Sequence, residues 1–282
     1  MERWLTGPVV TKSFIPRLCL SLLLLFISPV HAVSLEGDLL HECRHPLLAE
    51  HHFYQLDFIF WENLAEGELR LAATERPDVL RAELIGRTLG AAAWLTGNRT
   101  QRYSSYMERQ ADGFLRSLTH EKEILKRRFG RLTASRKRYR FDYALRKVVL
   151  EKEKSGAFQV VKNFDLPLTQ QPVDILTGFY NLRNGCYGAV TPGRHLEIPT
   201  FSSKGFSMID IEVMTPLRRQ KLSFFPPGGI LLQVTLDPEI FETTNGGVYV
   251  WFNDAGQPAR GIVENVIGLG DVRGHLRKEV IP

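Results

Sequence analysis

Alternation between apolar and polar positions is the dominant pattern of the chain from Phe53 onward. A period of two, broken by turn residues about every 8 to 12 positions, is typical of an antiparallel sheet and not of strands that alternate with helices. The last third shows the pattern most clearly, where Val248, Val250 and Phe252 share one face of a strand. We therefore expect a mainly β fold, a curved antiparallel sheet that forms a barrel or half-barrel.

Two segments depart from this period and predict helices. In the first, apolar residues recur at helical spacing over 175–183, Asp174 can accept hydrogen bonds from the free N–H groups of the first turn, and Asn184–Gly185 ends the run. The second, Leu89–Leu95, holds three successive alanines and precedes a glycine, which indicates a short helical segment. The apolar face of the 175–183 helix needs a partner, so we expect it to pack on the inner face of the sheet.

The first 32 residues have the three parts of a secretory signal peptide. Basic side chains precede an apolar run from Leu18 to Ile27, and Val30–His31–Ala32 forms a small-residue cleavage box. The run is too short for a membrane span, which needs about 20 residues. We therefore expect cleavage after Ala32 and export, with the protein soluble in the periplasm or peripheral to the outer membrane; an uncleaved anchor is the alternative. The rest should comprise an N-terminal extension, 33–52, and a single β-rich domain, 53–282.

Composition narrows the function only a little. Of the 282 residues, 44% are hydrophobic and 24% charged, which is ordinary for a globular protein. The formal net charge of +5 includes the basic residues of the leader, and together with export it argues against a nucleic-acid partner. Cys43 and Cys186 remain after cleavage, and an oxidising compartment favours a disulfide between them; two buried free thiols are the alternative.

Motifs for the common enzyme chemistries are absent from the sequence. It has no phosphate-binding glycine loop followed by lysine, no zinc-protease helix and no serine between glycines at a nucleophile elbow. His41, Cys43 and His45 alternate in a way that could chelate zinc or copper. The competing interpretation, a polar lead-in segment whose Cys43 pairs with Cys186, is favoured because the two uses of Cys43 exclude each other. We therefore predict no catalytic residues, no metal site and no cofactor.

A basic stripe is the second candidate site. Arg136, Arg138 and Arg140 share one face of a predicted strand, and the planar guanidinium group suits phosphate and carboxylate. The stripe could therefore bind anionic lipid headgroups or an envelope polyanion. The competing and favoured interpretation is a solvated outer face whose charges discourage edge pairing.

The order of several segments resembles a family of exported bacterial proteins, the domain of unknown function 3108. The resemblance covers nearly all of the chain after the leader, and it rests on these segments: the opening strand around Tyr54–Gly67, Arg140–Phe141–Asp142–Tyr143, the helix Asp174–Arg183, Pro192–Gly193, and Val250–Asp254 leading to Gln257–Pro258. It implies an exported, mainly antiparallel β protein. It offers no catalytic residues, because the family is defined by sequence and architecture and not by an established activity.

A curved sheet with an apolar inner surface suggests a binding module. We therefore predict a non-enzymatic envelope protein that binds a lipid-like or glycan ligand, or a partner protein. The alternatives are a metal-dependent or hydrolytic envelope enzyme and a structural scaffold of the outer membrane; the oligomeric state stays open. An internal cavity of several hundred cubic ångströms would favour the binding module. Its candidate lining residues, for each of which ordinary core packing is the competing interpretation, are Phe58, Phe60, Trp94, Phe179, Tyr180 and Trp251.

Overall fold

The computed structural model of the chain describes residue 43 and residues 49–58 and 61–277. Contacts divide the chain into residues 1–39 and 40–282, and the description below concerns the second unit alone. The expected signal peptide, most of the expected extension 33–52 and Phe60 lie outside the described residues. Within the described ranges, no helix combines the length and the apolar character needed to cross a bilayer.

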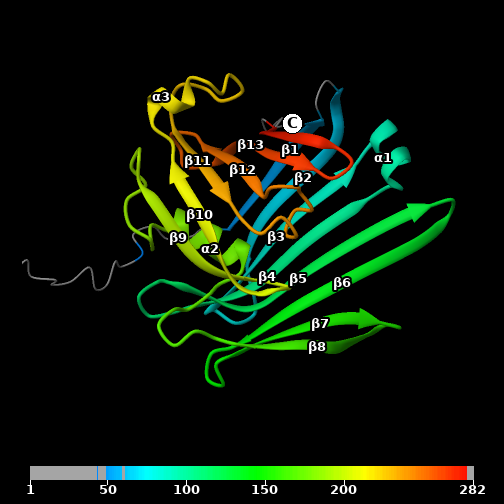
Figure 1. The fold of residues 1–282 in the computed structure, drawn as a ribbon, viewed down its shortest axis with the longest axis vertical. Helices are drawn as coiled ribbons and strands as arrows, with labels where there is room; N and C mark the ends of the chain where they lie inside the picture. Colours follow the sequence, from blue (N-terminus) through cyan, green and yellow to red (C-terminus); the bar gives the residue numbers. More distant parts are fainter. Residues whose placement is uncertain (1–42, 44–48, 59–60, 278–282) are drawn as a thin grey trace, which may run out of the picture. The chain divides into compact units, whose positions relative to one another are not determined.

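Most of the described chain belongs to one antiparallel sheet of 14 strands (Figure 1). The strands are β1 Glu50–Phe58, β2 Trp61–Ala73, β3 Val79–Thr88, β4 Thr100–Arg109, β5 Leu115–Arg128, β6 Arg131–Asp142, β7 Lys147–Lys154, β8 Ala157–Asp165, β9 His195–Ser202, β10 Gly205–Val213, β11 Ile230–Thr235, β12 Gly247–Phe252, β13 Pro258–Val266 and β14 Gly270–Leu276. The helices are α1 Gly90–Thr96, α2 Ile175–Arg183 and α3 Pro216–Arg219. The expectation of a mainly β protein with one packed helix and a short helical segment is confirmed.

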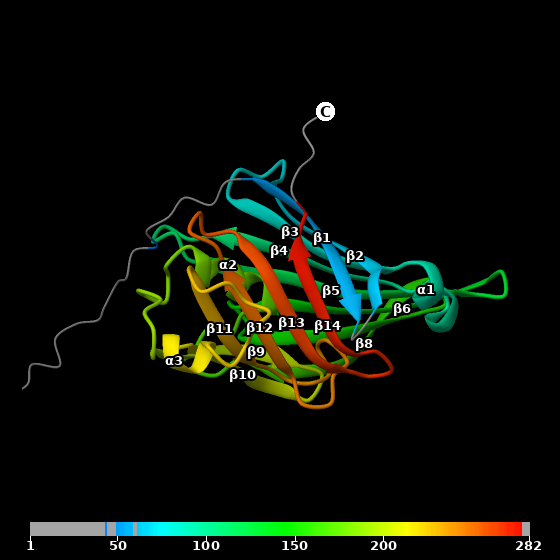
Figure 2. The ribbon, with the colours of Figure 1, turned by 90° about the horizontal axis from the view of Figure 1, so that it is seen from above.

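The strand order explains how the sheet is curved. It runs β8-β7-β6-β5-β4-β3-β2-β1-β14-β13-β12-β11-β10-β9, so two meanders spread from a central seam between β1 and β14. The chain crosses from one outer edge, β8, to the other, β9, through α2. Figures 1 and 2 show α2 lying between the two halves of the sheet. The sheet is therefore an open half-barrel and not a closed barrel, because β8 and β9 form no ladder in the described part of the chain.

The two halves form facing apolar walls. One buried cluster comes mainly from β9–β12 and includes Ile198, Ile211 and Leu232, and a second comes mainly from β2–β5 and includes Leu69 and Met107. Three partly buried side chains contact both clusters: Ile175, Phe179 and Phe241. Helix α2 thus fills one end of the space between the walls and holds them apart.

Helix α2 begins where the sequence predicts. The Asp174 carboxylate accepts hydrogen bonds from the backbone N–H groups of Leu176 and Thr177 at 3.0 and 3.1 Å, which satisfies two donors of the first turn. Ser105 and Ser117 of the sheet also donate to this carboxylate, each at 2.6 Å. The cap therefore fixes the helix start on the inner face of β4 and β5.

A disulfide fixes the other end of α2. Cys43 and Cys186 are bonded, with their Cα atoms 4.4 Å apart and a sequence separation of 143. The predicted pairing is confirmed. Both terminal guanidinium nitrogens of Arg183 donate to Glu50, at the start of β1. The disulfide thus joins Cys43, before β1, to Cys186, just after α2, and the ion pair joins β1 itself to α2.

Candidate ligand cavity

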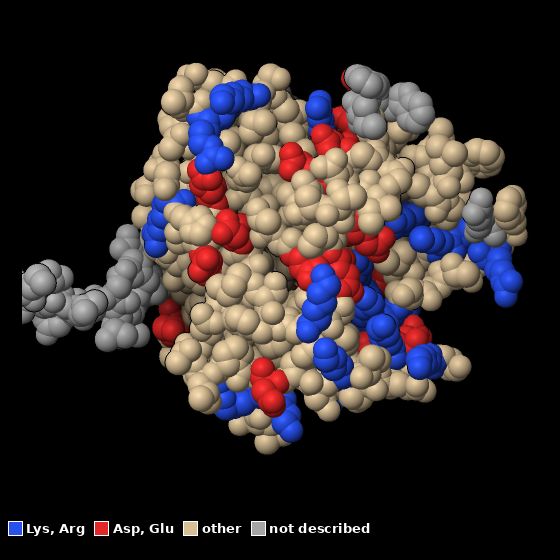
Figure 3. All heavy atoms as spheres, viewed as in Figure 1, with Lys and Arg blue, Asp and Glu red and all other residues tan. Residues whose placement is uncertain are grey.

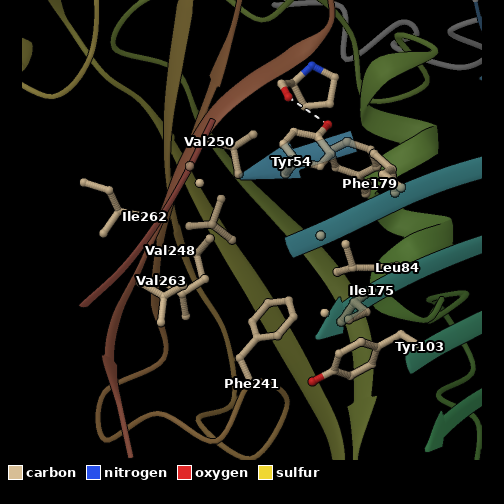
Figure 4. A pocket seen from close by; sticks show the side chains of 18 of the residues that line it. Tyr54, Leu84, Tyr103, Ile175, Phe179, Phe241, Val248, Val250, Ile262 and Val263 are labelled. Carbon is tan, nitrogen blue, oxygen red and sulfur yellow. Dashed lines mark hydrogen bonds between the residues drawn. The ribbon is translucent and has the colours of Figure 1, made fainter. Parts of the chain in front are cut away.

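An apolar cavity of about 400 Å³ lies between the two walls of the half-barrel (Figure 4). Side chains from β1, β3 and β4 face side chains from β12 and β13 across it, and α2 lies at one end. The residues that show these walls best in the figure are Tyr54, Leu84, Tyr103, Ile175, Phe179, Phe241, Val248, Val250 and Val263. Alternation along each strand directs the strand residues of this set inward, whereas Ile175 and Phe179 come from α2 and Phe241 from the segment between β11 and β12.

Glycines on inner-face positions keep part of this space open. Gly67 pairs with Gly86 across β2 and β3, and Gly261 pairs with Gly274 across β13 and β14; all four line the cavity. None of the four has a positive φ, so the backbone does not require glycine there. A β carbon on Gly86 would meet no heavy atom within 4 Å. Neither packing nor backbone geometry therefore explains why residue 86 is a glycine. A glycine within a strand often marks a position that another group approaches closely.

The deep part of the cavity presents few polar groups that a ligand could use. The Tyr54 hydroxyl donates to the carbonyl oxygen of Pro258 at 2.9 Å, and the Tyr103 hydroxyl donates to that of Ile240 at 2.5 Å. Burial raises the pKa of both phenols above the ordinary value, so they remain protonated. Both hydroxyl protons are already used within the protein, which leaves an apolar surface for a ligand.

Polar lining residues gather at the end away from α2. Along the inner face of β4, Met107 lies near α2, whereas Gln101 lies at the opposite end. Arg99, just before β4, and Thr88 of β3 lie beside Gln101. Arg99 donates to Gln101 at 2.9 Å and to Glu242 at 2.7 Å. The cavity is therefore amphipathic along its length, with an apolar end at α2 and a charged, hydrogen-bonding end near α1.

The segment between β11 and β12 closes one side of the cavity. Lys122 donates to the carbonyl oxygens of Glu239 and Ile240, both at 3.0 Å, and lies 3.3 Å from the Glu242 carboxylate. Burial would raise the pKa of Glu242, but the hydrogen bond from Arg99 and the charge of Lys122 lower it below the ordinary value. Glu242 is therefore ionised at neutral pH, and this pairing holds Phe241 against both walls.

Two of the predicted lining residues do line the cavity and two lie away from it. Phe58 and Phe179 are among the lining side chains. Trp94 is 78% exposed, because it lies on the solvent side of α1 while Ala92 and Ala93 are buried. Trp251 lies on the outer face of β12, where its indole N–H donates to the carbonyl oxygen of Gly228 at 2.7 Å.

Tyr180 and Phe60 are the remaining two predicted lining residues. Tyr180 of α2 is fully buried against the β2–β5 wall, and its hydroxyl donates to Glu50 at 3.0 Å instead of facing the cavity. Nothing is described for Phe60. None of the inner-face glycines was predicted to line a cavity, although glycines within alternating runs, such as Gly86, are a signal that could have found them.

The predicted basic stripe is neutralised within the sheet. Arg136 donates to Glu123 at 2.5 Å, and Arg138 and Arg140 both donate to Glu151, at 2.8 and 3.1 Å. These pairs join neighbouring strands on the outer face. Arg136, Arg138 and Arg140 therefore do not form an uncompensated positive surface.

A serine, a histidine and an aspartate meet below α2, but their geometry is not that of a nucleophilic triad. Ser105 Oγ and Asp174 Oδ1 both approach the same imidazole nitrogen, Nδ1 of His120, at 2.9 and 3.4 Å. In a triad the serine and the carboxylate occupy opposite ring nitrogens. All three residues are also buried. Burial would raise the pKa of Asp174, but His120 and the serine hydroxyls lower it, so the carboxylate is an ionised helix cap.

The described residues contain no group of three or more potential metal ligands. Cys43 of the proposed histidine–cysteine cluster is disulfide-bonded, and His41 and His45 lie outside the described residues. The fold and the site thus define an open antiparallel half-barrel that encloses an apolar cavity, without a recognisable catalytic centre in the part that the structure describes.

Comparisons with known proteins add little to this description. No family model matches the chain, so the resemblance to the domain of unknown function 3108 stays a prediction, and no curated protein matches it. Among solved structures, it is similar to a β-barrel-like protein of the domain of unknown function DUF1849 from Brucella abortus. The two share 12% identity with a TM-score of 0.41, over 82% of this chain and 97% of the other. A likeness at that level carries no functional argument.

Proposed function

We propose that this protein is a non-enzymatic binding protein of the bacterial envelope that holds a lipid-like ligand in the cavity. The observation that carries the proposal is the apolar cavity of about 400 Å³, in which Gly86 leaves space that no neighbour fills. Sites for small molecules typically measure about 300 to 1,000 Å³. A core whose only task was stability would be expected to fill such a space, because voids forfeit packing energy.

The distribution of polar groups favours an amphiphile over a glycan. A sugar needs many hydrogen-bonding partners along its whole length, whereas here they gather near Arg99 and Gln101. We place the apolar tail against Phe179 at the α2 end and the polar group near Arg99. The leader pattern of residues 1–32 and the disulfide support an exported protein, since disulfides persist in oxidising compartments.

The test begins with native mass spectrometry of the protein purified from a periplasmic extract, followed by delipidation and titration with a homologous series of fatty acids. Each buried methylene contributes about 0.8 kcal/mol, so the Kd should fall about fourfold per added carbon. The decrease should stop at the length that fills the cavity. A Kd that does not depend on chain length, or a failure to saturate with any member of the series, would reject the proposal. A retained carbohydrate would favour a glycan ligand instead.

A further inference from the structure

Large apolar side chains are exposed together at the α1 end of the described unit. Trp94 and Leu95 on α1 are 78% and 59% exposed, and Phe129 and Leu132 at the β5–β6 hairpin are 95% and 55% exposed. The two elements are joined directly, because the backbone N–H of Arg127 donates to the carbonyl oxygen of Gly97 at 2.6 Å. Figures 1 and 2 both show α1 and the hairpin tip at this end. We call these four side chains the apolar edge.

The backbone conformation of the hairpin turn distinguishes Phe129 from an ordinary surface residue. Arg128 pairs with Arg131, so Phe129 and Gly130 form a two-residue turn with φ values of 49° and 76°. Turns of this kind favour asparagine or aspartate at the first position, and a bulky residue there is strained. The aromatic side chain at this strained position is 95% exposed, and strain of this type is often retained for function.

The charge around the apolar edge indicates what it contacts. Lys126, Arg127 and Arg131 are exposed at the hairpin tip, and they form no ion pair with any residue that the structure describes. No Asp or Glu occurs from 124 to 141. Figure 3 shows lysine and arginine side chains beside uncharged, protruding side chains at this end. Aromatic and leucine side chains flanked by basic residues are the pattern of a surface that sits in the interface of an anionic bilayer.

We infer that the apolar edge docks the protein on an anionic lipid bilayer, with Phe129, Trp94 and their apolar neighbours in the interfacial region and Arg127 and Arg131 on the headgroups. This surface differs from the predicted stripe of Arg136, Arg138 and Arg140, whose charges are paired. It goes beyond the proposed function and stands independently of it, since a protein with an empty cavity would present the same edge.

Co-sedimentation with vesicles tests this inference. The purified protein, without its leader, should bind vesicles of mixed phosphatidylcholine and phosphatidylglycerol at low salt, and bind pure phosphatidylcholine more weakly. Phe129→Asn should weaken partitioning about tenfold, in line with the transfer of one large apolar side chain. Because asparagine suits the turn, this variant should be at least as stable as the wild type, so reduced binding cannot be attributed to unfolding.

The substitutions Arg127→Gln and Arg131→Gln test separately how much the basic side chains contribute to vesicle binding. Each should weaken binding to the anionic vesicles about fivefold at low salt and have little effect at high salt. Leu217→Asn on α3, where the leucine is 74% exposed, and Lys221→Gln are matched controls that should bind as the wild type does. Failure of the wild type to sediment with anionic vesicles would overturn the inference. Edge variants that sediment as well as the controls would also overturn it, and would leave the edge as a contact for a protein.

Discussion

Filling the open space at Gly86 should make the protein more stable and a poorer binder at the same time. Gly86→Leu adds four carbon atoms to a cavity wall where a β carbon meets no neighbour within 4 Å. Burial of a leucine side chain contributes about 1.5 to 3 kcal/mol, and removal of a strand glycine adds about 0.5 to 1 kcal/mol. The free energy of unfolding should therefore rise by about 2 to 4 kcal/mol, which raises the Tm by about 5 to 15 °C.

The same four carbons occupy volume that a ligand would use. At about 0.8 kcal/mol per methylene displaced, the variant should bind a cavity-filling fatty acid about 100-fold more weakly. Thermal unfolding followed by circular dichroism and titration calorimetry on delipidated protein measure the two effects. Gly228→Leu is the matched control, because Gly228 also has open space and no positive φ but lies outside the cavity. A destabilised Gly86→Leu, or one with unchanged affinity, would refute the view that Gly86 preserves ligand space.

Two further predictions concern the elements that hold α2. Cys186→Ser removes a disulfide that joins positions 143 apart in sequence, and the chain-entropy model gives a loss of up to about 5 kcal/mol in the free energy of unfolding. Urea unfolding of the oxidised wild type and of the variant measures this loss. Equal urea midpoints would show that the disulfide does not stabilise the fold. Asp174→Ala removes charged hydrogen bonds and should cost about 3 kcal/mol at pH 7. Because the folded-state pKa of Asp174 lies below its ordinary value of 3.8, this contribution is present above that pH and is lost as pH falls. The variant should therefore lose less stability than the wild type on acidification, and parallel acid unfolding curves would contradict the assignment.

Local patterns were sufficient to predict most of the fold. Alternation placed Val248, Val250 and Phe252 on one face, which is the inner face in the structure, and the cap at Asp174 predicted the start of α2. These signals depend only on neighbours in sequence. The choice between barrel and half-barrel was not accessible in the same way. It depends on whether β8 and β9 form hydrogen bonds across the opening, where the structure instead has packing of Phe164 on Phe201, with ring centroids 5.7 Å apart. No local pattern encodes that distance.

The candidate site was less predictable, because its lining residues were chosen by the size of the side chain and not by the face of the strand on which they lie. Trp251 lies between Val250 and Phe252, so strict alternation already places it on the outer face, and its size alone suggested a ligand contact. Gly67 and Gly86 were missed for a different reason. Each is visible in sequence as a glycine within a strand, but their alignment across β2 and β3 requires the register, which only the folded sheet supplies.

The two ends of the cavity relate the proposed ligand site to the proposed bilayer contact, although each can be tested separately. Its apolar end abuts α2, which the disulfide to Cys43 and the hydrogen bonds from Arg183 to Glu50 hold in place. Its polar end at Arg99 lies two residues from Gly97, the residue that bonds to the hairpin carrying Phe129. A ligand that left past Arg99 would thus emerge beside the apolar edge. Gly86→Leu should leave vesicle binding intact and Phe129→Asn should leave fatty-acid affinity intact, because neither side chain contributes to the other's surface.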